Sequence, residues 1–150
     1  MLHDSLSLEL HSKSLSVTDL SSWTVRIEDG LLVRETAPGL RLDKSGLVPA
    51  LQVKVDDDHL GQFVEVVDFL EVWSWNSHYD PEECGTRIFG GTSWSLSVKM
   101  DGRNCHASGE NAYPSFADVN KTSLREERFG MLVAALEYIF STQTGQIRIN

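Results

Sequence analysis

The sequence predicts an α+β fold in which an antiparallel sheet, built from two β-hairpins plus flanking strands, is covered by two main helices. Asp-Gly pairs at Asp29-Gly30 and Asp101-Gly102 each separate two runs of strand-like residues, which is typical of hairpins. Apolar residues recur at helical spacing within 58–73 and 123–140. Strands and helices form separate runs without regular alternation, so we expect no major parallel sheet, and a single domain over residues 1–150.

The first half of the chain contributes strands near Leu6, where leucines alternate with polar residues, and near Val53. In the hairpin 23–35, a two-residue turn would pair Val25 with Arg34. A three-residue loop of residues 28–30, with Gly30 as a left-handed bulge, instead pairs Val25 with Val33 and Ile27 with Leu31. We expect the three-residue loop, because both pairs then share one apolar face.

The second hairpin gives the opposite result under the same test. A two-residue turn at Asp101-Gly102 pairs Val98 with Cys105 and Leu96 with Ala107, and a slip of one residue would mix the two faces. We therefore expect a buried row made of Trp94, Leu96, Val98, Met100, Cys105 and Ala107. The order of the strands in the sheet is left open.

The helix over 58–73 follows three aspartates, Asp56 to Asp58, which are typical helix N-caps. The last helix is predicted to start at Ser123, which forms a capping box with Glu126, and to end just before Gly145. Pro114 predicts a short helix over 115–119 between the second hairpin and the last helix. The stripes expected to face the sheet are Leu60, Phe63, Val64, Val67 and Leu70, and Phe129, Leu132, Val133, Leu136 and Ile139.

Several of these segments carry a resemblance. The chain resembles a group of small uncharacterised bacterial proteins in five successive features. These are a helix ending in Trp73-Ser74-Trp75, a polar loop with Tyr79-Asp80, the strand Gly91-Thr92-Ser93-Trp94-Ser95-Leu96, the Asp101-Gly102 turn and the segment Gly109-Glu110-Asn111-Ala112-Tyr113-Pro114. The resemblance covers about the C-terminal two-thirds of the chain. It implies a fold and a bacterial source, and it implies no activity.

Composition narrows the classes of function. A formal net charge of −9, with scattered lysines and arginines, argues against binding to nucleic acid or to an anionic membrane and favours a basic protein partner. Two cysteines are too few for a secreted disulfide scaffold, and residues 1–10 lack the pattern of a signal peptide. We therefore expect a cytoplasmic protein, and the sequence does not indicate its oligomeric state.

The sequence contains few candidate catalytic or metal-binding residues. Cys84, with His78 as base and Asp80 nearby, could form a small hydrolase or transferase site, because an activated thiolate needs a neighbouring imidazole. Cys105 and His106 are consecutive on a strand and point to opposite faces, which argues against a shared zinc ion. We expect no metal and no cofactor, and we assign no catalytic residue.

A loop after the first helix gathers large aromatic side chains and carboxylates. Trp75 and Tyr79 are predicted to anchor a partner protein, with Trp75 too large to fit under the sheet, and the acidic rim is predicted to consist of Asp80, Glu82 and Glu83. The leading functional hypothesis is therefore a non-enzymatic protein-interaction module of regulatory or immunity type. The hydrolase or transferase is the alternative.

Overall fold

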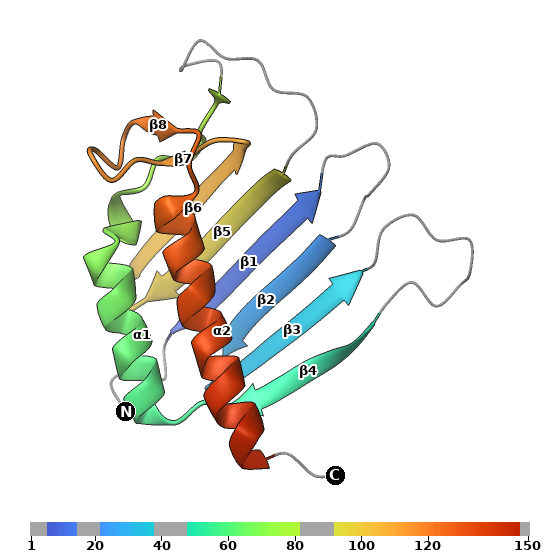
Figure 1. The fold of residues 1–150 in the computed structure, drawn as a ribbon. Coiled ribbons are helices and arrows are strands. Elements are labelled where there is room, and N and C mark those ends of the chain that lie inside the picture. Colours follow the sequence, from blue (N-terminus) through green and yellow to red (C-terminus); the bar gives the residue numbers. More distant parts are fainter. Residues whose placement is uncertain (1–5, 15–21, 38–47, 82–91, 148–150) are drawn as a thin grey trace, which may run out of the picture.

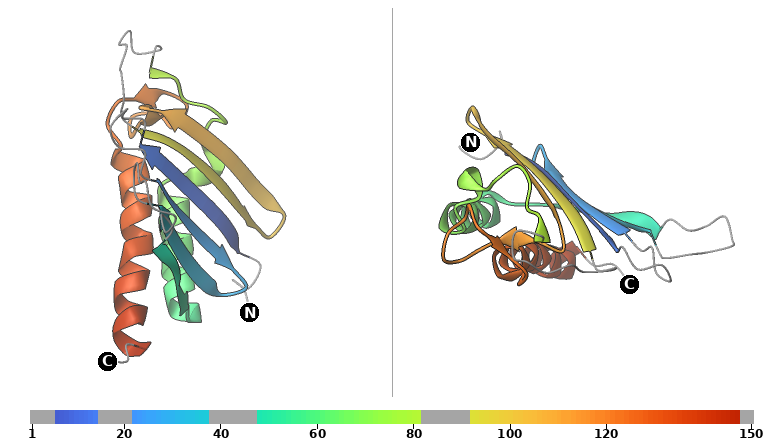
Figure 2. Two further views of the ribbon diagram at one scale, coloured as in Figure 1. Left: turned by 90° about the vertical axis from the view of Figure 1, so that its right-hand side faces the viewer. Right: turned by 90° about the horizontal axis from the view of Figure 1, so that it is seen from above.

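The computed structural model of the protein describes residues 6–14, 22–37, 48–81 and 92–147. These residues form a six-stranded antiparallel sheet in the order β4-β3-β2-β1-β5-β6, and both long helices cover the same face of it (Figures 1 and 2). The predicted α+β class is confirmed. The elements are β1 (Ser7–Ser14), β2 (Ser22–Glu28), β3 (Leu31–Ala37), β4 (Val48–Lys54), α1 (Asp57–Phe69), the 3-10 turn η1 (Val72–Ser74), β5 (Thr92–Met100), β6 (Arg103–Glu110), β7 (Tyr113–Pro114), β8 (Thr122–Ser123) and α2 (Glu127–Ile147).

The first strand lies in the interior of the sheet. β1 pairs with β2 on one side and with β5 on the other, so Leu10 has Val25 and Leu96 as its two neighbours across the strands. Leu6, Leu8 and Leu10 are buried toward the helices, whereas Glu9 and His11 face solvent on the opposite side. The alternation in the sequence thus places the core between the sheet and the two helices.

The second hairpin is confirmed in its register. Val98 pairs with Cys105 and Leu96 with Ala107, around a turn in which Asp101 and Gly102 have φ values of 51° and 80°. Positive φ at both central residues is the signature of the type I′ turn. All six side chains predicted to line the core are buried.

The first hairpin also has a two-residue turn, so the prediction of a three-residue loop was wrong. Ile27 pairs with Leu32, and Val25 pairs with Arg34. Leu32 is fully buried, whereas Leu31 faces outward. Arg34 is tolerated on the helix-facing side because α2 supplies partners: the guanidinium lies 4.9 Å from the centroid of the Phe140 ring and donates two hydrogen bonds of 3.0 Å to Glu137.

The cap of α1 is confirmed. The side chain of Asp56 accepts a hydrogen bond from the backbone N–H of His59, which satisfies one of the free donors at the helix start. The predicted buried stripe faces the sheet, but the α-helix ends at Phe69 and is followed by η1.

The chain between the second hairpin and α2 departs from the prediction. The helix expected over 115–119 is absent: these residues lie between two short paired strands, β7 and β8. Ser123 caps no helix, since its hydroxyl accepts the backbone N–H of Arg125, and α2 begins four residues later than predicted. Gly145, expected just beyond the end, lies inside α2. The apolar stripe of α2 faces the core, with Val133 only half-buried.

A cluster of aromatic rings around Trp94 joins the sheet to the helical layer. The Trp94 indole N–H donates a 2.8 Å hydrogen bond to the carbonyl of Ala112, which bends the chain after β6 back over the ring. Gly109 lies under this bend, where an added Cβ would be 2.3 Å from the oxygen of Ala112 and 2.8 Å from the indole nitrogen. Glycine is therefore required at 109 by close packing.

We predict that Gly109→Ala destabilises the protein by about 2 kcal/mol, because the new methyl group must push backbone and indole apart. Gly130→Ala, inside α2, is the matched control: its Cβ would meet no atom within 4 Å, so helix propensity should stabilise it by up to about 1 kcal/mol. Urea denaturation of both variants measures the difference. Equal stability of the two variants would contradict the packing around Trp94.

Candidate functional site

The predicted aromatic anchors are core residues. Trp75 and Tyr79 are 5% and 0% exposed, so the prediction that they present a surface to a partner was wrong. The Trp75 indole N–H donates to the carbonyl of Leu70, and the Tyr79 hydroxyl donates to the carbonyl of Val119 and accepts from the backbone N–H of Asn76. Both rings pack on Trp94, which leaves no room for an external partner. Asp80 is half-buried, and Glu82 and Glu83 lie outside the described residues.

Of the predicted hydrolase or transferase pair, the structure describes His78 but not Cys84. Cys84 lies outside the described residues, and His78 is an exposed side chain whose Nδ1 is 3.3 Å from the hydroxyl of Ser108. Cys105 is buried as predicted, and burial raises the pKa of its thiol. Within the described part of the chain, no three His, Cys, Asp or Glu side chains are grouped so that they could hold a metal ion.

The open face of the sheet carries a polar row. His11 has Thr24 Oγ1 2.8 Å from Nδ1 and Glu9 Oε1 2.7 Å from Nε2. Hydroxyl, imidazole and carboxylate therefore lie in hydrogen-bonded sequence. About half of the His11 and Glu9 side-chain surface is exposed, so this is a solvated sheet surface rather than a cleft that would orient a substrate.

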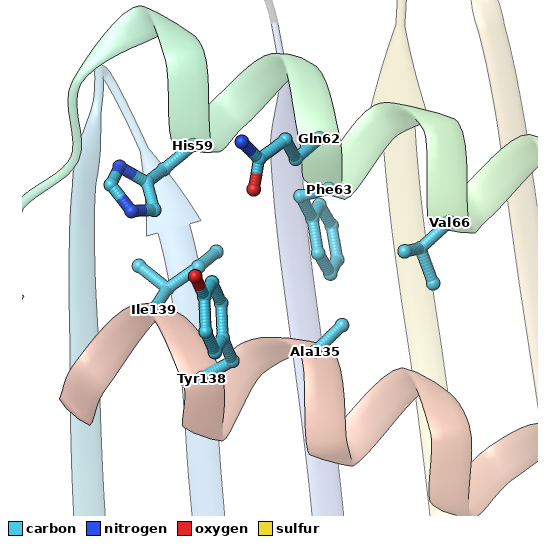
Figure 3. A pocket seen from close by; sticks show the side chains of 7 residues that line it. All are labelled: His59, Gln62, Phe63, Val66, Ala135, Tyr138 and Ile139. Carbon is cyan, nitrogen blue, oxygen red and sulfur yellow. The ribbon is translucent and has the colours of Figure 1, made fainter. Parts of the chain in front are cut away.

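A groove between α1 and α2 is the most distinctive feature of the helical surface (Figure 3). It has a volume of about 230 Å³, and its lining is predominantly apolar. Val66 and Ala135 point into the space between the helices, and Tyr138 reaches toward Gln62 and His59 at one end. The lining residues, which define the interhelical groove, are His59, Gln62, Phe63, Val66, Ala135, Tyr138 and Ile139.

The relative position of the two helices shows which exposed residues continue the groove. His59 Nε2 lies 3.3 Å from Thr142 Oγ1, and Arg128 Nη1 donates to the carbonyl of Leu70 over 2.8 Å, so the helices run antiparallel. Phe69, one turn after Val66, therefore comes level with Met131, one turn before Ala135. Phe69, Tyr138 and Met131 are 67%, 56% and 42% exposed. They continue the apolar surface along both edges of the groove.

Arg128 fixes the end of the groove nearest Phe69. Only 5% of this residue is exposed, and its guanidinium donates to the carbonyls of Ser115 and Phe116 as well as Leu70. A buried cation is tolerated when it is fully hydrogen-bonded, and Glu71 adds a carboxylate 3.7 Å away. No sequence pattern indicates this role, because the three carbonyls come from two separate segments of the chain.

The charged side chains of α1 beside the groove are all acidic. The sequence of α1 contains Asp57, Asp58, Glu65 and Asp68 but no lysine or arginine, and the only basic residue of α2 is the buried Arg128. Asp58 and Glu65 are exposed, and they form no ion pair with any other residue that the structure describes. The apolar groove is thus bordered by uncompensated negative charge on the α1 side.

In comparisons with known proteins, no family model and no curated protein matches the chain. The resemblance of the C-terminal two-thirds of the chain to small bacterial proteins stays a prediction. Among the described helices, none has the length and apolar composition needed to cross a bilayer.

We predict that Cys105→Ala lowers the free energy of unfolding by about 1 kcal/mol, through loss of a small buried side chain. Cys105→Asp should cost several times as much, because it places an unpaired carboxylate in the core. Asn104→Asp, at the exposed neighbouring position, is the matched control and should be nearly neutral. Urea denaturation checks all three. Rapid labelling of Cys105 by a thiol reagent in the folded protein would contradict its burial.

A second prediction concerns alkaline pH. Burial, together with the negative charge and hydrogen bond of Glu126, raises the pKa of Tyr113 to about 12. The unfolded chain releases this proton near pH 10 and the folded protein holds it until about pH 12, so stability should fall as pH rises through this window. Tyr113→Phe should flatten that part of the profile, measured by urea denaturation from pH 8 to about 12. An unchanged slope would show that Tyr113 is not the group responsible.

Proposed function

We propose that the protein is a non-enzymatic interaction module that binds a basic segment of another protein in the interhelical groove. The single observation that carries this proposal is the combination of an apolar groove with a rim that bears negative charge and no exposed lysine or arginine on either helix. Apolar contacts would supply affinity, and charge would select the partner and speed its association.

The exposed apolar residues support a binding role. Single apolar residues are common on protein surfaces, but contiguous apolar patches mark interaction sites. Phe69, Tyr138 and Met131 extend the groove lining instead of being scattered over the surface. Phenylalanine and tyrosine bury a large area with few rotatable bonds, which suits them to anchor a partner.

The charges support a basic partner over a second copy of the chain. Two copies joined through this groove would bring Asp58 and Glu65 of one close to the same carboxylates of the other. The formal net charge of −9 adds a general repulsion between copies. A partner segment rich in lysine or arginine would instead be attracted by these carboxylates and by the net negative charge, and an apolar side chain of the segment would fill the groove.

The hydrolase or transferase alternative has no comparable support from the described residues. His78 is exposed and lies beside Ser108, and its hypothetical nucleophile lies outside the described residues. The groove itself contains His59, but this imidazole is held by the cap residue Asp56, with Nδ1 2.7 Å from Oδ1. The binding module therefore remains the function that we propose.

The test begins with a photo-crosslinking amino acid at Gln62, which lines the groove, and at Lys99 on the open sheet face as control. In the host cell, we expect position 62 alone to capture a basic protein. Phe69→Ala should then weaken binding of that purified protein by about thirtyfold, equivalent to about 2 kcal/mol, whereas Leu31→Ala, an equally apolar change on β3, should leave Kd unchanged. Glu65→Gln should mainly slow association at low salt.

Three outcomes would overturn the proposal. These are capture of the chain by itself through position 62, capture of an acidic protein, and equal loss of affinity in the Phe69→Ala and Leu31→Ala variants.

A further inference from the structure

A second cavity lies on the flank of α2 that faces away from α1. Its volume is about 450 Å³, within the range of small-molecule sites. Helical spacing puts Val133, which lines this cavity, and Ala135, which lines the interhelical groove, on opposite flanks of α2. The residues that define the α2 pocket here are Ser12, Trp23, Thr92, Glu126, Phe129 and Gly130.

The shape of the α2 pocket follows from small residues placed among large ones. Ser12 pairs with Trp23 on one side and with Trp94 on the other, so a small side chain separates two indoles on the helix-facing side of the sheet. Gly130 lies opposite in α2, where an added Cβ would meet no atom within 4 Å. A glycine inside a helix is unfavourable relative to alanine, and here it leaves space open between Trp23 and Phe129.

The polar side chains of the α2 pocket supply two hydroxyls and one carboxylate. Ser12 is 8% exposed, and its hydroxyl has no hydrogen-bond partner among the residues that the structure describes. A buried hydroxyl left unpaired is unfavourable, so a ligand atom that reaches it gains affinity. Thr92 adds a second hydroxyl, and Glu126 adds a carboxylate that accepts a hydrogen bond from Tyr113.

Among the residues that the structure describes, no lysine or arginine lines the α2 pocket. Arg125 is next to Glu126 in the chain, but its guanidinium is exposed and lies 3.6 Å from Glu127. The partial positive charge at the start of α2 is already complemented by Glu126 and Glu127. The net charge offered to a ligand is therefore negative.

We infer that the α2 pocket binds a small organic cation that has a flat apolar body and an amino group. The apolar body lies between Trp23 and Phe129, with the open space at Gly130 above it. The ammonium group bonds to the carboxylate of Glu126 and the hydroxyl of Ser12, and the indole face of Trp23 adds a cation–π attraction. This site is independent of the interhelical groove and of the function proposed for it.

The test uses three probes that share a phenyl ring: 2-phenylethylammonium, 2-phenylethanol and 3-phenylpropionate. We expect the cation to bind with a Kd on the order of 1 mM and at least tenfold more tightly than the anion. NMR titration should show saturable shifts at the amides of Ser12, Trp23 and Gly130. Glu126→Gln should remove the preference for the cation, and Ser12→Ala should weaken its binding about fivefold.

Gly130→Leu fills the α2 pocket and should abolish binding without loss of thermal stability, since its Cβ has free space. Met131→Leu, at the next and exposed position of α2, is the matched control and should bind normally. Ser12→Ala, a truncation by one oxygen, keeps the test valid if the larger substitution disturbs folding. Absence of saturable shifts up to about 10 mM, equal affinity for the three probes, or unchanged binding in Gly130→Leu would each overturn the inference.

Discussion

The indole of Trp94 holds together the parts of the molecule that carry its binding surfaces. Its ring lies 5.1 Å from Phe129 of α2, 6.0 Å from Trp75 beyond α1 and 6.0 Å from Tyr113 of β7, while its N–H fixes the carbonyl of Ala112. The first turns of α2 are therefore positioned by a residue of the central sheet. Because α2 separates the interhelical groove from the α2 pocket, both sites inherit their geometry from this cluster.

The two hairpins show what a sequence pattern can predict and where it fails. In the second hairpin the inward positions are apolar except Arg103 beside the turn, whose guanidinium lies over the Trp73 ring. The requirement for one buried face therefore selects the observed register. The first hairpin contains the same Asp-Gly turn, but the correct register puts Arg34 inward. That arrangement is stable only because Glu137 and Phe140 lie above it, and these residues are about a hundred positions away in the chain. The local sequence pattern of a hairpin cannot indicate partners that are so distant in the chain.

The predicted binding surface failed for the same reason. Trp75 and Tyr79 look like exposed aromatics in a polar loop, yet they are buried by Trp94, and their polar atoms bond to Leu70, Asn76 and Val119. Satisfied polar atoms let large aromatics enter a core at little cost. By contrast, the helical spacing of Val66 and Phe69 does place them outside the main buried stripe of α1. The sequence therefore contained a signal for the interhelical groove, although not for its opposite wall.

The position of β1 in the middle of the sheet has a consequence for synthesis in the cell. Leu8 pairs with Ile27 soon after translation, but its other neighbour, Val98, emerges about 90 residues later. At ordinary translation rates, the second edge of β1 stays without its partner for on the order of ten seconds. An unpaired apolar strand edge is a template for aggregation. The charged residues that flank its leucines, Glu9 and Lys13, are the kind that protect such edges until β5 arrives.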